Sequence, residues 1–206
     1  MVNTQQPGLS TRKALVASCL ALMVLGGCAA RQHIYDSYAL LNSRKLAVLP
    51  GAGAPGPDGH QAGRMQAGAM ITELANLQRY EVTGSGLLRR ELAGGGDPWD
   101  PETSTSIAKK LDIDLLVLPE ITDYYFTKKS RSRSFLLGSS SWTTSEYWVT
   151  VRTMIVKPDG KLVYSGVGSA TSDMGYGPAV LQATSLCVDE LRLFLAQTGS
   201  RKDTTP

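Results

Sequence analysis

The feature that most constrains this chain is an apolar N-terminal stretch that ends at Cys28. Arg12 and Lys13 come first, with no acidic residue before them, and an apolar run from Ala14 to Leu25 follows. This order is typical of an export signal. The apolar run of about 12 residues is much shorter than the roughly 20 that a membrane-spanning helix needs, so we expect the segment to be removed. The folded domain must then be built from what lies downstream.

The four residues Leu25-Gly26-Gly27-Cys28 resemble the lipobox of bacterial lipoproteins. The resemblance covers residues 1–28 and implies cleavage before Cys28, a diacylglyceryl thioether on its sulfur and a third acyl chain on its amine. Two or more acyl chains anchor a protein stably in a membrane. Because residue 29 is alanine rather than aspartate, analogy with enterobacterial sorting favours the periplasmic face of the outer membrane. The alternative is an ordinary signal peptide with a chance cysteine.

Loss of the signal also decides how the domain is stabilised. Cys19 leaves with the signal and Cys28 is acylated, so Cys187 is the one thiol left and no internal disulfide can form. Stability must come from a hydrophobic core, which a single domain of this length can build. Removing Arg12 and Lys13 lowers the formal net charge of +3 by two. A nearly neutral exported chain lacks a broad surface for polyanions, so we expect no nucleic-acid partner.

We divide the chain into four parts: a signal peptide over 1–27, a lipidated tether over 28–44, a periplasmic α/β domain over 45–198 and a disordered tail over 199–206. Within the tether, apolar residues between Ile34 and Leu41 allow a short docking helix. No internal repeat is evident, which favours one domain.

Hydrophobic periodicity predicts an alternation of strands and helices through the domain. Strands are expected at 45–49, 80–83, 115–126 with a bend near Pro119, 147–156 and 162–167. Helices are expected at 60–78, 87–92 and 103–111, with one last helix whose apolar side runs from Val180 to Phe194. Early alternation favours parallel pairing, while the turn at Pro158-Asp159-Gly160-Lys161 requires an antiparallel hairpin. The predicted fold class is α/β (α+β), a mixed sheet of about five strands with helices packed on it.

Four pieces in this order carry a second resemblance: 44–50, 107–111, 114–121, and 147–156 followed by Asp159-Gly160. They resemble periplasmic lipoproteins with a TolB N-terminal-like or anticodon-binding-like α/β domain, the group of the curli secretion lipoprotein CsgG and the penicillin-binding-protein activator LpoB. The resemblance spans about 45–195 and includes no catalytic signature. It implies docking and assembly with a protein or glycan partner of the envelope, in secretion, exopolysaccharide-export, flagellar or peptidoglycan machinery, and leaves self-association open.

A second hypothesis is a subunit of an oligomeric outer-membrane secretion channel of the CsgG type. In that channel each protomer contributes two long hairpins, with membrane strands of about 9 to 11 alternating residues. Residues 127–146 have the length for one hairpin, although 135–141 alternates poorly. The stretch Gly168–Gly177 is too short and too polar for the second.

The strongest candidate binding segment joins four positive charges to two aromatic side chains: Lys128, Lys129, Arg131, Arg133, Phe135 and Trp142. We predict that these residues form a partner-binding loop. Such a loop could meet anionic headgroups, an acidic glycan or a protein, since Arg and Trp supply much of the energy at interfaces. The alternative is a solvated hairpin tip.

Patterns for chemistry are weak in comparison. The run Gly51-Ala52-Gly53-Ala54-Pro55-Gly56 fits GxGxxG, but its proline and Pro57 remove amide donors that a bound pyrophosphate needs, so a flexible loop is favoured. The mature chain has only two histidines, His33 and His60, and no paired cysteines, so we expect no metal and no cofactor.

Hydrolytic chemistry is similarly unsupported. Ser85 and Ser169 lack the GxSxG pattern of a nucleophile elbow. An envelope hydrolase that uses paired carboxylates from Asp112, Asp114, Glu120 and Asp123 is the third hypothesis. We expect that the protein is not an enzyme.

Overall fold

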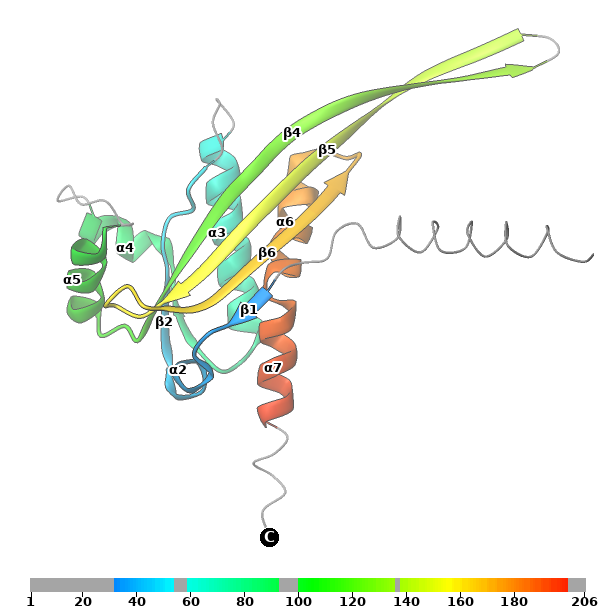
Figure 1. Ribbon diagram of the computed structural model, residues 1–206. Coiled ribbons are helices and arrows are strands. Elements are labelled where there is room, and N and C mark those ends of the chain that lie inside the picture. The colour runs from blue at the N-terminus through cyan, green and yellow to red at the C-terminus, as the bar shows by residue number, and fades with distance from the viewer. Residues whose placement is uncertain (1–31, 54–58, 93–99, 136–137, 200–206) are drawn as a thin grey trace, which may run out of the picture.

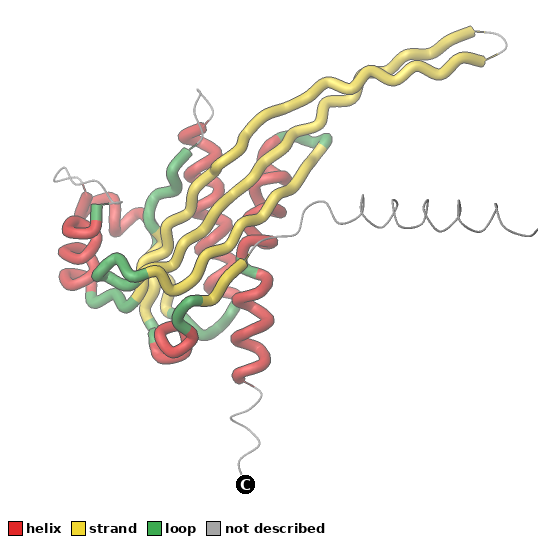
Figure 2. The backbone as a smooth tube through the Cα atoms, viewed as in Figure 1, coloured by secondary structure: helices red, strands yellow, loops and turns green. Residues whose placement is uncertain are grey.

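The computed structural model describes residues 32–53, 59–92, 100–135 and 138–199, which form a mixed six-stranded sheet with helices packed on it (Figures 1 and 2). The strands are β1 (Gln32–Ile34), β2 (Lys45–Val48), β3 (Glu81–Thr83), β4 (Leu115–Phe135), β5 (Gly138–Val156) and β6 (Leu162–Ser172). The helices are α2 (Ser37–Asn42), α3 (Gly59–Asn76), α4 (Ser85–Leu92), α5 (Pro101–Leu111), α6 (Tyr176–Cys187) and α7 (Asp189–Gly199). The predicted fold class is confirmed.

The sheet has the strand order β1-β6-β5-β4-β2-β3. β2 lies parallel to both β3 and β4, as the early alternation predicted, whereas β4, β5, β6 and β1 pair antiparallel. The irregularity that the sequence predicted near Pro119 lies two residues further on. β4 runs through the proline, and its register with β5 shifts between Ile121 and Asp123. A bulge of this kind increases twist without ending the strand.

Local capping explains how α5 is placed. Asp100 accepts a hydrogen bond from the Thr103 amide at 2.9 Å, and Pro101 stands in the first turn, where a missing N–H costs nothing. At the other end, Asp112 takes a left-handed conformation (φ 54°), which turns the chain into β4. The acid at the start and the lysines of the last turn also suit the helix dipole.

The helices cover the two faces of the sheet unequally. α3 and α6 bury one face over much of its width, and this core includes Leu74, Val117, Val151 and Val180. On the other face, α4 and α5 cover a smaller cluster that ends at Leu118 and Met154. The second face of β4 and β5 beyond these residues is therefore not part of either core cluster.

Two glycines on β6 allow α6 to lie directly on the sheet. A Cβ added at Gly168 would lie 2.1 Å from the carbonyl oxygen of Ala183, and one at Gly166 would lie 2.2 Å from that of Cys187. Any side chain at these positions would push the helix away. The Cys187 thiol is buried in this contact and donates to the Val151 carbonyl at 3.3 Å.

Residues 32–44, assigned from the sequence to a tether, belong to the folded domain. β1 pairs with β6, with Gln32 opposite Gly166, and α2 buries Ala39 and Leu40. The Tyr80 hydroxyl donates to the Leu40 carbonyl at 2.9 Å. The tether prediction is wrong for these residues because their apolar side chains fill a core that lies far away in sequence, although the short helix itself is confirmed. Residues 28–31, including Cys28, lie outside the described residues, as do the signal peptide and residues 200–206.

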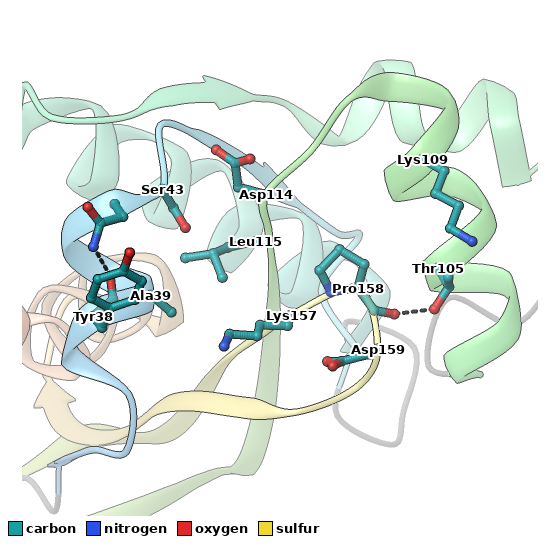
Figure 3. Close-up of a pocket in the computed structure, with 11 residues that line it drawn as sticks. Tyr38, Ala39, Ser43, Thr105, Lys109, Asp114, Leu115, Lys157, Pro158 and Asp159 are labelled. Carbon is teal, nitrogen blue, oxygen red and sulfur yellow. Dashed lines mark hydrogen bonds between the residues drawn. The ribbon is translucent and has the colours of Figure 1, made fainter.

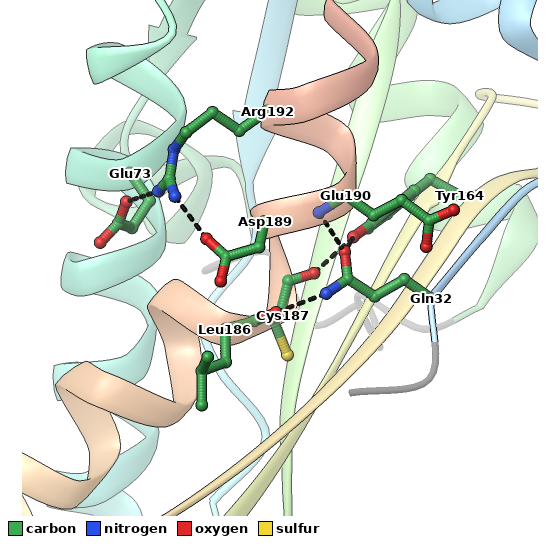
Figure 4. A network of polar contacts seen from close by, with 8 residues as sticks. All are labelled: Gln32, Glu73, Tyr164, Leu186, Cys187, Asp189, Glu190 and Arg192. Atoms are coloured by element: carbon green, nitrogen blue, oxygen red, sulfur yellow. Dashed lines mark hydrogen bonds and ion pairs between the residues drawn. The ribbon is translucent and has the colours of Figure 1, made fainter. Parts of the chain in front are cut away.

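The predicted last helix is two helices, α6 and α7, separated at Val188. Gln32 occupies the break: its Nε2 donates to the Leu186 carbonyl at 2.6 Å, and its Oε1 accepts from the Glu190 amide at 2.6 Å (Figure 4). In a continuous helix those two backbone groups would bond to each other. A side chain from β1 therefore replaces one helical hydrogen bond, which the local sequence does not reveal.

Candidate functional site

The predicted binding loop is a β-hairpin. β4 and β5 pair from Leu116 opposite Val156 to Phe135 opposite Gly138. We call residues 127–135 and 138–146 the arm, which projects well beyond the helices (Figures 1 and 2). The loop prediction is wrong because no glycine or proline interrupts residues 120–137. The Ser and Thr residues that follow form the second strand and pair with the first.

Both edges of the arm are open among the described residues. β6 ends at Ser172, opposite Tyr147, so no described strand pairs with β5 before that residue. On the other side, β2 pairs with β4 only as far as Val117, followed by a single bridge between Ala52 and Glu120. The arm is consequently a two-stranded ribbon, and most of its described side chains are exposed.

Strand alternation divides the predicted binding residues between the two faces of the arm. Lys129 is opposite Thr144, Arg133 is opposite Ser140, and Trp142 is opposite position 131. Facing pairs share a side of the sheet and neighbours along a strand alternate, so Lys129, Arg133 and Trp142 lie on one face, which we call the basic face. Positions 131 and 135 have the same parity as this set. Lys128 lies on the opposite face.

The second face of the arm is lined by hydroxyl groups. Ser130 is opposite Thr143, Ser132 is opposite Ser141, and Lys128 is opposite Ser145. We call this the hydroxyl face. The arm therefore presents two chemically different surfaces, whereas the sequence predicted a single mixed patch.

The basic face contains one internal ion pair. Lys129 pairs with Glu146, a diagonal cross-strand neighbour that the sequence analysis did not select. Trp142 is 44% exposed. Register could have revealed the pair, since Glu146 stands opposite Thr127, but only once the hairpin pairing is known. Arg133 is also exposed on this face.

Aromatic side chains surround the base of the arm, and the sequence analysis did not recognise them as a group. Tyr124 stacks on Tyr176 of α6 with ring centroids 3.7 Å apart, and Tyr147 meets the same ring edge-on at 4.8 Å. On the other face, Tyr125 and Trp148 stack at 6.0 Å. We call these residues, with Phe126, the aromatic collar. Such contacts hold the base of the ribbon against α6.

Two hollows lie at opposite ends of the sheet. One, of about 400 Å³, lies where β6 ends beside the arm and is lined by Lys129, Glu146 and Asp173 among others. The other, of about 560 Å³, lies at the opposite end of the sheet between α2, α5 and the β5–β6 turn (Figure 3). The exposed ring of Tyr38 stands at its rim.

Two charged groups around the larger hollow, Lys157 and Asp114, already have partners. Lys157 lies 2.7 Å from Asp36, and their hydrogen bond raises the pKa of the lysine and lowers the pKa of the carboxyl. Asp114 accepts the backbone amides of Arg44 and Lys45 at 2.7 and 3.0 Å. No nucleophile hydrogen-bonded to a base is found among the described lining residues.

Three of the residues considered for hydrolysis, Asp112, Glu120 and Ser169, contact other side chains. Asp112 bonds to Lys45 at 2.6 Å, which lowers the pKa of its carboxyl, whereas a general acid needs a raised pKa. Glu120 pairs with Arg152 at 2.5 Å. Ser169 Oγ lies 3.1 Å from Thr150 Oγ1.

The two histidines considered as metal ligands lie apart from each other in the fold. His33 packs edge-on against Tyr35, and His60 is exposed at the start of α3. Among the described residues, no three His, Cys, Asp or Glu side chains gather as a metal site. None of the helices in the described ranges is both long and apolar enough to cross a membrane.

The glycines of the GxGxxG run pack on the start of α3. A Cβ at Gly51 would lie 2.3 Å from the Gly63 carbonyl oxygen, and one at Gly53 would lie 2.3 Å from that of Gly59. Close backbone approach accounts for these glycines without a bound phosphate. The rest of the run, residues 54–56, lies outside the described residues.

No protein-family model matches this chain, and no curated protein matches its sequence. Among solved structures, the PelC dodecamer from Paraburkholderia phytofirmans is 12% identical with a TM-score of 0.48, over 78% of this chain and 95% of that one. Lipoprotein GNA1162 from Neisseria meningitidis is 14% identical with a TM-score of 0.42, over 78% and 97%. Likenesses at this level identify no family. The resemblance to the CsgG and LpoB group stays a prediction.

Proposed function

We propose that this protein is a non-enzymatic lipoprotein of the bacterial envelope. Acyl chains on Cys28 hold it on the periplasmic face of the outer membrane, and the arm docks a protein or glycan component of an envelope assembly. The lipobox-like residues before Cys28 support the anchor. The function is positional, since an anchored domain meets its partner at a high effective concentration.

The arm is the observation that carries this proposal. Isolated two-stranded hairpins are at best marginally stable in water, and open strand edges are normally covered. The arm has two open edges and two exposed faces in the described structure, with no described helix against either face of its outer part. A partner that covers the ribbon would supply the missing contacts.

The engaged carboxylates support a non-catalytic role. Asp112, Asp114 and Glu120 are bound to a lysine, two backbone amides and an arginine. These contacts suit structural roles for the three side chains, and for Asp112 the lowered pKa opposes proton donation.

The alternative of a channel subunit is less well supported. A channel of the CsgG type requires two long hairpins from each chain. In the described ranges, β4–β5 is the one such hairpin. β6 ends at Ser172 and is followed closely by α6. If the protein were a channel subunit, the purified lipoprotein should form large rings and make vesicles leak.

The test is to remove the arm and keep the anchor. Thr127 and Glu146 face each other, so an Asn-Gly turn can replace residues 128–145 and close a shorter hairpin. We expect the variant to fold and to be acylated normally, but to lose the partners recovered by in-cell photo-crosslinking and mass spectrometry. The photoreactive residue is placed at exposed position 126, at the base of the arm, which the parent, the short-arm variant and the control all retain.

A matched control is Lys109→Gln, an exposed change at the far end of the domain. It should keep every partner. If the short-arm variant kept the same crosslinked partners as the parent, the arm would not be the docking element. If the protein purified from its native cells kept residues 1–27 and carried no fatty acid, the proposed membrane anchor would be wrong.

A further inference from the structure

We infer that the arm lies along the membrane that holds the anchor, with its basic face against anionic lipid headgroups. The inference rests on the proposed acylation of Cys28. It commits the basic face to one class of partner, the phosphate groups of lipids, and leaves the hydroxyl face for the envelope component.

The first step is the position where the fold begins. Gln32 is held by three hydrogen bonds: two link it to the α6–α7 junction, and the Tyr164 hydroxyl donates to its Oε1 at 2.8 Å (Figure 4). The start of β1 is therefore fixed to the body of the domain. Cys28 precedes Gln32 by only four residues, which span at most about 14 Å when extended. The membrane must lie next to this edge of the sheet.

The second step is the direction in which the chain enters. β1 is antiparallel to β6, with Gln32 opposite Gly166 and Ile34 opposite Tyr164. Followed backwards, β1 therefore points toward the C-terminal end of β6. That end, Ser172, faces Tyr147, where the arm leaves the sheet. The chain therefore enters β1 from the side on which the arm projects, with Gln32 six residues short of the level of Ser172.

The third step is reach. From Tyr147 to Gly138 the arm extends nine strand steps, about 30 Å at the usual rise. An arm of this length, which projects on the side from which the anchored chain enters the fold, should meet the membrane surface unless it is directed steeply away from it. Because only four residues separate Gln32 from Cys28, the domain has little freedom to turn the arm away from the membrane.

The fourth step is chemistry. Arg133 and Trp142 suit a headgroup layer, where guanidinium groups meet phosphates and indole rings favour the interface. Lys129 adds a charge that it shares with Glu146. The hydroxyl face has no apolar band, so the arm should rest on the bilayer rather than cross it.

The experiment uses the mature lipoprotein in vesicles that contain brominated lipids. The chain has three tryptophans, and Trp99→Phe with Trp148→Phe leaves Trp142 as the one reporter. We expect brominated lipids to quench its emission in vesicles with anionic phospholipid, and less in zwitterionic vesicles or at high salt. Arg133→Gln should lower arm association about fivefold, the effect of one basic residue at an anionic surface.

Lys128→Gln is the matched control, because it removes the same charge from the opposite face of the same arm. It should leave the quenching unchanged. Equal losses from Arg133→Gln and Lys128→Gln would overturn the assignment of the face. Unquenched Trp142 in protein that remains on the vesicles would overturn the inference and leave the proposed docking function standing. Protein that does not remain on the vesicles would overturn both.

Discussion

The two halves of the β4–β5 pair are continuous in hydrogen bonding but opposite in environment. We call residues 115–121 of β4 and 149–156 of β5 the root. Root side chains such as Val117, Val151 and Ile155 are fully buried between helices, and β2 and β6 pair with the root edges. The arm has the same ladder without helices or neighbouring strands. Backbone hydrogen bonding is therefore the same in the root and the arm. The difference in stability between them must come from burial of apolar surface.

The aromatic collar marks the boundary between these halves. Tyr124 and Tyr147 pack against Tyr176 of α6, while Tyr125 and Phe126 are 49% and 51% exposed. Beyond them, no residue of the arm belongs to a core cluster. The comparison teaches that the helices bury the root of this sheet, and that the arm lacks the burial that stabilises the root.

Hydrogen exchange should give the largest difference between the halves. We expect root amides to exchange only through global unfolding, and arm amides to exchange at least roughly 100-fold faster through local opening. Mass spectrometry of the free protein, with peptides on both sides of the collar, measures this directly. Equal protection in the two halves would show that the arm is stable without a partner.

Truncation of a core side chain should separate the halves by stability. Leu116 is fully buried in the cluster under α4 and α5, so Leu116→Ala should lower the free energy of unfolding by about 2–5 kcal/mol. Ser132→Ala, in the exposed arm, should change it by less than about 0.5 kcal/mol. Urea titration of both variants tests the pair. Similar losses would contradict the assignment of stability to burial.

A glycine pair tests where a helix lies directly on the root. Gly168→Ala places a methyl group against the Ala183 carbonyl and should cost about 1–3 kcal/mol through overpacking. Gly68→Ala, on the open side of α3 with nothing within 4 Å, should be neutral or stabilising by up to about 1 kcal/mol. Thermal unfolding measures both changes. A tolerated Gly168→Ala would mean that α6 does not press on β6.

The smallest effect concerns pH at the far end of the root. Lys157 hydrogen-bonds to Asp36, which lowers the pKa of that carboxyl below its ordinary value of 3.8. Because the folded-state pKa is the lower one, the pair stabilises the fold above the unfolded-state pKa, and this contribution is lost as the pH falls through the folded-state value. Asp36→Asn should therefore flatten stability between about pH 5 and pH 2.

The measurement is a series of urea titrations across that range. Lys157→Gln removes the same hydrogen bond and should flatten the profile in the same direction. A profile for either variant that overlays that of the parent would contradict the coupling.

Local pattern was sufficient where a segment packs on what is near it. The helix over 103–111 has its cap and proline written in three consecutive residues, and α5 forms there. The alternation over 147–156 predicted half of β5 and its turn into β6. The other half of β5 was missed, since Ser and Thr residues form a strand there only because β4 lies alongside.

Long-range contacts decided the rest. Nothing near Gln32 in sequence indicates that it interrupts a helix more than 150 residues later, or that residues 32–42 belong to the core. The predicted patch of six residues was correct as a segment, but its division into a basic face and a hydroxyl face depends on strand register. Glu146 and Tyr176 were missed for the same reason.

The sequence by itself predicts an export signal and a lipidation site, and it predicted most of the strands and helices in their order, because these depend on residue type and spacing over short stretches of chain. Only the tertiary structure decided where the fold begins, from which side the chain enters β1, and which side chains share a face of the arm. Those properties follow from pairing between distant strands, where a shift of one residue moves every side chain to the other side.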